Sequence, residues 1–293
     1  MSARIWGLSL GGLLCGLLVT LWVAGDLLSR PAAREVGPPP QELGAQTVSL
    51  STVPGQHVVG WFARGESQGA VLLLHGVRGD RRQMTERALF LQQAGDATLQ
   101  IDLPAHGESS GERITFGARE AAGVEAAVRF LRQTLPGVQI AVIGVSLGAA
   151  STVLAGLDPA LQAVILESMY PTIDEAVQDR LAMRLGRVGA GLAPLLLWQL
   201  PLRVGLSAEA LRPIDRLPSL GAPVLIASGA DDQHTLWPET QRLFDAAKEP
   251  KVLWRVEGAA HVDLHDHAPE PYRQRVLEFL AQHLRGGAAQ TAH

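Results

Sequence analysis

One serine in this chain stands at a position that suits a nucleophile. The pentapeptide Gly144-Val145-Ser146-Leu147-Gly148 directly follows the apolar run 138–143. A G-x-S-x-G sequence at the end of a strand is typical of a sharp strand-to-helix turn, the nucleophile elbow, whose glycines avoid clashes while the serine hydroxyl is held exposed. Because glycine and serine are common, the pentapeptide alone also fits an ordinary turn, so the rest of the chain must supply the partners.

A serine hydroxyl needs a base within hydrogen-bond reach, and a histidine base needs a carboxylate that fixes its tautomer. Elbow-type sites place these groups in the chain order serine, acid, histidine. Asp231 and Asp232 follow a predicted strand at 223–228, and His261 follows another at 252–256. Both groups would then lie at the carboxyl ends of strands, where open α/β sheets bind ligands. We predict Asp232, which is deeper in its loop, as the acid, with Asp231 as the alternative.

Several histidines compete for the role of base. We predict His261, because it follows a Gly-Ala-Ala turn directly after a strand. The other late histidines lie in or near the last predicted helix, at positions 265, 267 and 283. His234 is interpreted as a loop histidine, with a place in the pocket wall as the alternative.

An oxyanion hole is predicted from two backbone N–H groups. The segment His75-Gly76-Val77-Arg78-Gly79 follows the apolar run 70–74. The N–H of Val77 in this loop and the N–H of Leu147, directly after the candidate nucleophile, would bind a tetrahedral oxyanion. His75 is expected to brace the loop rather than to take part in chemistry.

A dense group of metal-ligand residue types follows the last predicted strand, comprising His261, Asp263, His265, Asp266 and His267. His265 and His267 are not spaced as i and i+4 on a helix, and the chain has no H-E-x-x-H sequence. We therefore predict neither a metal nor another cofactor.

From about Gln46 onward, strand-like and helix-like segments alternate. An alternating hairpin pattern at 47–63 is followed by short apolar runs between amphipathic stretches. This alternation predicts an α/β fold with a mostly parallel sheet covered by helices on both faces. We expect one domain over 46–285 and a disordered tail at 286–293.

The stretch 169–220 interrupts this alternation. It contains the leucine-rich run 192–200 and three arginines at helical spacing, Arg180, Arg184 and Arg187. We predict a small helical cap inserted between two strands, which packs on the core and covers the site.

Composition excludes some classes of partner. The chain has 293 residues, a formal net charge of −4 and scattered basic residues, so no nucleic-acid footprint is expected. Its single cysteine, Cys15, excludes an intrachain disulfide.

The first 26 residues are the compositional outlier. The run Ile5–Gly25 is uncharged, and its length of about 20 residues suits a helix that crosses a bilayer. We predict a transmembrane anchor over 1–26, with a cleaved signal peptide as the alternative. The Pro-rich stretch 27–45 is predicted to be a stiff linker.

With these motifs in this order along the sequence, the chain resembles the α/β-hydrolase fold superfamily over about 46–285. Within this range, Asp102-Leu103-Pro104-Ala105-His106-Gly107-Glu108-Ser109 is similar to the family turn D-x-x-G-x-G-x-S, with Ala105 in place of a glycine. The Glu167-Ser168 pair and the inserted cap resemble the Bem-like branch of membrane-tethered hydrolases, except that Val77 stands where that branch often has asparagine.

The resemblance implies Ser146, Asp232 and His261 as a catalytic triad. It also implies a bacterial protein anchored in the inner membrane, and signal cleavage would instead make it secreted or periplasmic. We expect a serine hydrolase that cleaves a carboxylic ester or thioester of a small or lipid-like substrate. The alternatives are an acyltransferase or peptidase with the same triad, and a hydrolase-fold binding protein without catalysis.

Overall fold

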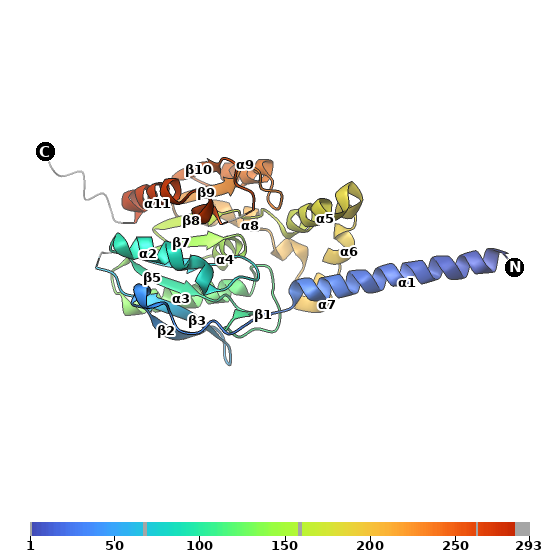
Figure 1. Ribbon diagram of the computed structural model, residues 1–293, viewed down its shortest axis with the longest axis horizontal. Helices are drawn as coiled ribbons and strands as arrows, with labels where there is room; N and C mark the ends of the chain where they lie inside the picture. The colour runs from blue at the N-terminus through green and yellow to red at the C-terminus, as the bar shows by residue number, and fades with distance from the viewer. Residues whose placement is uncertain (1, 67–68, 158–159, 262, 285–293) are drawn as a thin grey trace.

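A computed structural model gives the fold of the chain. It describes residues 2–66, 69–157, 160–261 and 263–284, with the backbone alone for residues 2–11, 13 and 14. A long helix, α1 (Ser2–Ser29), extends away from a rounded α/β body (Figure 1).

Eight strands of the described chain form one twisted sheet in the order β10-β9-β8-β7-β4-β5-β3-β2. The antiparallel pair β2–β3 forms one edge, and all pairs from β5 to β10 are parallel. The strands are β2 (Gln46–Ser51), β3 (His57–Ala63), β4 (Gly69–Leu74), β5 (Ala97–Ile101), β7 (Gln139–Val145), β8 (Ala163–Glu167), β9 (Val224–Gly229) and β10 (Lys251–Val256). The central strands therefore all end at the same edge of the sheet.

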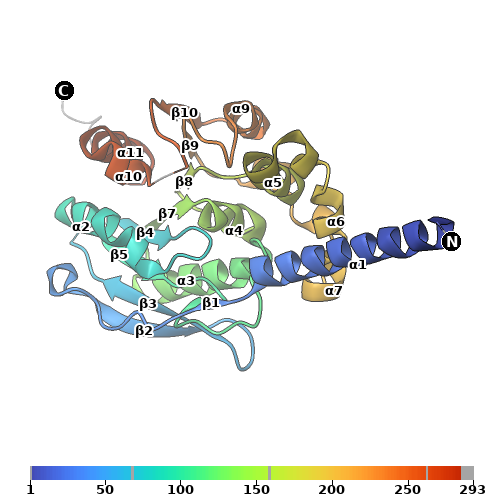
Figure 2. The same ribbon diagram turned by 45° about the vertical axis from the view of Figure 1, so that its right-hand side comes forward.

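Helices cover both faces of this sheet, because its central strands are apolar on both sides. Val71 and Leu73 of β4 face one core, and Leu72 and Leu74 face the other. The first core is closed by α2 (Thr85–Gln93), α10 (Leu264–His267) and α11 (Pro269–His283). The second is closed by α3 (Glu120–Thr134), α4 (Leu147–Ala155) and α9 (Trp237–Ala246) (Figure 2).

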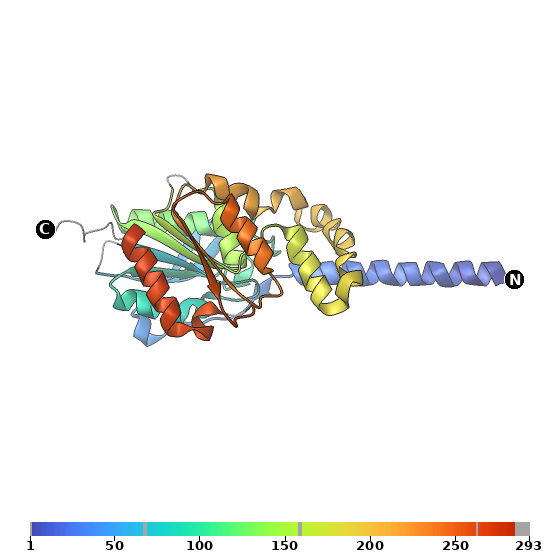
Figure 3. The same ribbon diagram turned by 90° about the horizontal axis from the view of Figure 1, so that it is seen from above.

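The stretch predicted as a cap, 169–220, is helical in large part. It contains α5 (Ile173–Ala190), α6 (Ala193–Leu197), α7 (Leu200–Val204) and α8 (Pro213–Arg216). Gly186 interrupts α5 with a non-helical backbone at φ 63°. The first three of these helices lie beside the C-terminal half of α1 in all views (Figure 3).

The stretch predicted as a linker, 27–45, contacts the domain instead of standing free. Strand β1 (Ala32–Ala33) pairs in parallel with β6 (His106–Gly107). Further along, the N–H groups of Val36 and Gly37 both donate to Glu108 Oε1 at 3.0 Å. An extended, proline-rich segment leaves its N–H groups unpaired, and here the domain supplies the acceptors.

A membrane-spanning helix is not supported by the described part of the chain, in which no single helix is both long and apolar enough. The apolar part of α1 that is described runs from Cys15 to Ser29. The segments Ile173–Ala190 and Ala193–Val204 reach the required length and apolarity only together, and they are bent by 113°.

The predicted fold class is confirmed, with differences at element ends. The sequence pattern predicts a helix over residues 116–135, but α3 begins at Glu120, because Phe116 and Gly117 have positive φ values and Glu120 accepts from the N–H groups of Thr115 and Gly117. The short elements β1, β6 and α10 were not predicted. The predicted disordered tail lies outside the described residues.

Candidate active site

Ser146 occupies a strained turn between β7 and α4. Its backbone angles are φ 49° and ψ −104°, a conformation that costs an L-residue free energy and is concentrated at functional sites. A side chain on Gly144 would lie 2.6 Å from the Ala149 nitrogen, and one on Gly148 would lie 2.6 Å from the Leu74 oxygen. Only glycine therefore permits the close approach on either side of the serine.

The elbow is held to the neighbouring strand. The N–H of Ser146 donates to the carbonyl of Glu167, at the end of β8, at 2.7 Å. The side chain of Ser146 is nearly buried and does not cap α4. Among the described residues, no hydrogen bond joins its hydroxyl to His261.

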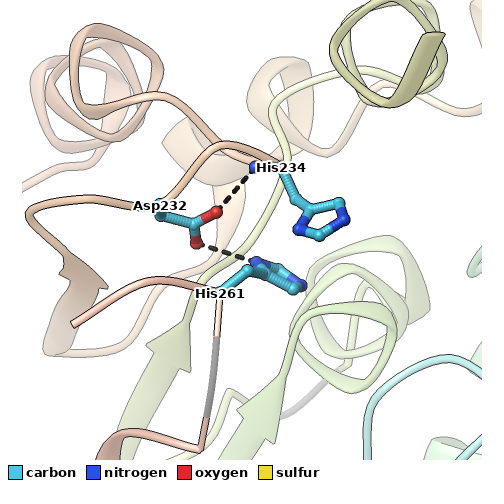
Figure 4. Close-up of side chains that lie close together, drawn as sticks. All are labelled: Asp232, His234 and His261. Carbon is cyan, nitrogen blue, oxygen red and sulfur yellow. Dashed lines mark hydrogen bonds and ion pairs between the residues drawn. The ribbon is translucent and has the colours of Figure 1, made fainter. Parts of the chain in front are cut away.

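Asp232 and His261 form a bonded pair after β9 and β10. His261 Nδ1 lies 2.8 Å from Asp232 Oδ2 (Figure 4). The other carboxylate oxygen accepts from the N–H groups of His234 at 2.8 Å and Thr235 at 3.0 Å. Burial alone would raise the pKa of Asp232, but the bond to His261 and these N–H donors hold it below its usual value. Asp231, the alternative acid, is exposed and is not bonded to His261.

His234 lies beside the candidate base, although the sequence left its position open. Its ring centroid is 4.6 Å from that of His261 (Figure 4). Its Nδ1 is buried and has no hydrogen-bond partner among the described residues. Burial and the neighbouring His261 both lower the pKa of His234, so the ring is neutral at pH 7.

The predicted oxyanion loop packs directly against the elbow. A side-chain carbon on Gly76 would lie 3.9 Å from Ser146 Cβ, and the N–H of Gly76 is fixed by Gln83 Oε1 at 2.9 Å. The N–H of Val77 has no backbone acceptor among the described residues. The N–H of Leu147 belongs to the first turn of α4, where N–H groups have no acceptor within the helix. Both predicted donors are thus available to an oxyanion.

His75 braces this loop. Leu103 N–H donates to its Nε2 at 3.0 Å, which leaves Nδ1 to donate to the Gly76 carbonyl at 2.7 Å. Burial lowers the pKa of His75 to about 4, so the ring stays neutral in this role.

The turn after β5 contains the departure from the family pattern. Ala105 adopts φ 63°, the left-handed region that favours the usual glycine. Asp102 organises the turn by accepting from Arg81 N–H at 2.7 Å and Glu108 N–H at 2.9 Å. The buried Arg81 guanidinium pairs with Asp102 and also contacts Glu108 at 2.6 Å.

Behind the elbow lies a buried ion network that the sequence did not indicate. The Arg87 guanidinium on α2 bonds Glu167 at 2.7 Å, Asp263 at 2.8 Å and the Tyr272 hydroxyl at 2.8 Å. Tyr272 also donates to Glu167. The network therefore joins the end of β8, where the Glu167 carbonyl accepts from the Ser146 N–H, to the segment that begins at Asp263. Its members are 80 to 185 residues from Arg87 in the chain, so no local pattern reveals it.

Within the described part of the chain, two groups of side chains have the spacing of metal ligands. Asp232, His234 and His261 form one, and Asp263, His265 and Asp266 form the other; in each, the ligand atoms lie within 4.8 Å of one another. Asp263 is already engaged by Arg87 and by the first N–H groups of α10. The first group is the predicted acid and base together with His234.

A model of the "Alpha/beta hydrolase family" matches residues 71–275, and the chain belongs to this family. An uncharacterised protein of Mycobacterium tuberculosis strain CDC 1551 is 32% identical over 80% of this chain and 76% of its own length. Uncharacterised YqkD of Bacillus subtilis is 25% identical over 78% of this chain and 75% of its own.

Solved structures share the fold. The Pyrococcus furiosus esterase Pf2001 has a TM-score of 0.71 at 22% identity, covering 87% of this chain and 99% of its own. Est1E of Butyrivibrio proteoclasticus, solved with ferulic acid, has a TM-score of 0.63 at 19% identity, covering 80% and 98%. The Bem-like branch that the sequence favoured is not singled out by these similarities and stays a prediction.

Proposed function

We propose that this protein is a serine hydrolase that cleaves carboxylic esters or thioesters through an acyl-enzyme on Ser146. The observation that carries the proposal is the 2.8 Å bond between Asp232 Oδ2 and His261 Nδ1. A carboxylate that accepts from Nδ1–H leaves Nε2 of the imidazole as a proton acceptor, which is the tautomer that a general base needs. The esterases among the proteins of similar fold support the choice of an ester substrate.

The reaction follows from the roles of these groups. His261 takes the proton of the Ser146 hydroxyl as its oxygen attacks the acyl carbon, and the N–H groups of Val77 and Leu147 bind the oxyanion. His261 then returns the proton to the leaving alcohol or thiol. Water, deprotonated by His261, attacks the acyl carbon of the acyl-enzyme; the bond to the Ser146 oxygen breaks, His261 returns the proton to that oxygen, and the acid is released. Because Ser146 and His261 are not bonded in the free protein, substrate binding must bring them into contact.

A serine substitution tests the proposal. In the full chain, Ser146→Ala should abolish both p-nitrophenyl ester hydrolysis and labelling by a fluorophosphonate probe, because the attacking oxygen is removed. Ser151→Ala is the matched control, since this buried serine on α4 bonds only the Leu147 carbonyl within its own helix. Unchanged turnover in Ser146→Ala would remove Ser146 from the mechanism. Product analysis with added alcohols separates hydrolysis from acyl transfer.

A further inference from the structure

Exposed apolar side chains gather at one end of the molecule. Sixteen large apolar side chains are exposed in the described part of the chain, and seven of them lie on α1. Six more belong to the cap helices and the turn between α6 and α7: Met183, Leu185, Val188, Leu195, Trp198 and Leu202. Val77 and Leu236, in the loops that hold the oxyanion donors and Asp232, are two others. Val53, at the β2–β3 turn, is the remaining one.

The exposure on the cap is large. Val188 is 79% exposed, Trp198 67% and Leu202 64%. A group of highly exposed apolar side chains on neighbouring helices indicates a site of interaction with a protein or a membrane. We call α5, α6 and α7 with these six side chains the cap surface.

The charge of the cap surface helps to decide whether a second protein copy or a membrane binds there. The 25 residues 180–204, which carry the six exposed apolar side chains, contain four arginines and no acidic residue, although the whole chain has a net charge of −4. The three acidic residues of α5, Asp174, Glu175 and Asp179, all precede this stretch. Arg184 and Arg187 are exposed and form no ion pair with any residue that the structure describes. Two copies of this surface would repel each other in a symmetric dimer, whereas an anionic surface would attract it.

The distribution of exposed apolar side chains around the neighbouring α1 favours contact with lipid over contact with a folded protein. Leu17, Leu18 and Val19 are all exposed, and consecutive residues point about 100° apart around a helix. Its apolar side chains thus face more than one direction, which a partner bound to one face would leave uncovered. The bend of 113° between the cap segments means that they cannot cross a bilayer as one rod, but they can lie along its surface.

The cap surface and α1 are joined to each other. Gln199 Nε2 donates to the Leu21 carbonyl at 3.0 Å, and the Arg203 guanidinium lies 4.1 Å from the Trp22 ring centroid. Arg203 also pairs with Asp26 at 3.3 Å. A bilayer that received α1 would therefore meet the cap surface as well.

We propose that the cap surface docks on a lipid bilayer that contains anionic lipids. Its apolar side chains enter the boundary between headgroups and acyl chains, and Arg184 and Arg187 bind headgroup phosphates, as in other interfacial amphipathic helices.

Site-specific probes test this docking in the full chain even if α1 alone binds lipid. In a Cys15→Ser background, Val188→Cys and Leu202→Cys each carry an environment-sensitive nitrobenzoxadiazole, and Val53→Cys is the matched control. On phosphatidylcholine–phosphatidylglycerol vesicles, the probes at 188 and 202 should shift to the blue. Nitroxide lipids should also quench them several-fold more than the probe at 53. Equal, weak quenching at all three positions overturns the proposal. A blue shift of the probes at 188 and 202 that increases with protein concentration in the absence of vesicles also overturns the proposal. It would show that a second copy of the chain covers the cap surface.

The arginines supply a second readout. Arg184→Gln with Arg187→Gln should lower partitioning onto the anionic vesicles by about 30-fold, at roughly one kcal/mol for each charge. Partitioning onto phosphatidylcholine alone should change little. Arg129→Gln with Arg64→Gln, which removes two exposed arginines outside the cap surface, is the control for net charge. An equal loss in the double variant and the control would show that the cap surface does not contact the lipid.

Discussion

Asp231 and Asp232 are neighbours in the chain with opposite environments. Asp231 is exposed, while the Asp232 side chain is fully buried and its two oxygens accept from His261, His234 and Thr235. The strained backbone of Ser146 is another local feature, fixed by the close packing at Gly144 and Gly148. Both features concentrate the proposed chemistry in a few side chains whose positions the surrounding backbone determines.

The two aspartates should respond differently to the same substitution. Asp232→Asn should lower kcat on p-nitrophenyl esters by about 10⁴-fold, because an amide at this position favours the wrong imidazole tautomer. Asp231→Asn, the control, should change kcat by no more than about twofold, as expected for an exposed residue. Steady-state kinetics measures both, and a larger loss in Asp231→Asn would reassign the acid.

At the scale of elements, the network around Arg87 ties together α2, the end of β8 and the helices after His261. Removing one partner of a buried ion pair leaves a charge buried without compensation. Arg87→Met should therefore lower the free energy of unfolding by about 3–5 kcal/mol. Urea titration measures this loss, with the exposed Arg129→Met as the control. A loss below about 1 kcal/mol would mean that the network contributes little.

A second contact between elements joins α5 of the cap to α9 of the core. Burial and the neighbouring carboxyl of Asp179 raise the pKa of Glu239 to about 8. Asp179 has a buried Oδ2 with no hydrogen-bond partner among the described residues, and its own pKa is raised by burial. The cap therefore packs on the core through a carboxyl group that is protonated at neutral pH.

This contact predicts a loss of stability in alkali. A carboxyl whose pKa is raised in the folded state stabilises the fold below its unfolded pKa, and this stabilisation is lost as the pH rises through about 8. Between pH 6 and 9 the free energy of unfolding of the native chain should fall by about 2 kcal/mol. The Glu239→Gln variant should not show this fall, since Gln cannot ionise. Thermal unfolding at both pH values checks this, with the exposed Glu125→Gln as the control. Parallel losses in all three proteins would contradict it.

At the scale of the whole molecule, docking of the cap surface on a bilayer should affect the binding of membrane-embedded substrates and not the chemical step. Arg184→Gln with Arg187→Gln should change kcat on a water-soluble ester little, because neither arginine bonds Ser146, Asp232 or His261 and Arg184 has only a small electrostatic effect on the neighbouring His234. On a long-chain ester embedded in anionic vesicles, the same variant should have a KM about tenfold or more higher, in line with the lost headgroup attraction. If the variant and the unaltered chain have the same kinetics on each of the two substrates, the cap surface does not help to bind substrate from a bilayer.

The parts of this molecule that could be predicted are those with short-range signals. The alternation of apolar runs and helical stretches located the strands of the sheet, and the Gly-x-Ser-x-Gly sequence located the turn at Ser146. Since parallel strands end at one edge, the placement of Asp232 and His261 near that edge followed from their positions after strands. Their mutual bond is a structural observation that the sequence allowed but did not require.

The parts that could not be predicted depend on contacts between distant segments. Arg87 looks like any helical arginine until the fold brings Glu167 and Asp263 to it. Residues 27–45 have the composition of a free linker, but Ala105, Gly107 and Glu108 of the domain accept hydrogen bonds from N–H groups of this stretch. The position of α1 beside the cap helices likewise depends on Arg203 and Gln199, far along the chain.

Asp26 near the end of α1 accepts from three arginines: Arg30 directly after this helix, Arg113 of the domain and Arg203 of the cap. A few residues later the Ser29 carbonyl accepts from the Ile114 N–H at 2.8 Å. Trimming the gene to begin near residue 41, as one would for easier purification, would strip Arg113 and Arg203 of their shared anion and Ile114 of its acceptor. The protein is therefore best expressed with residues 1–40 intact.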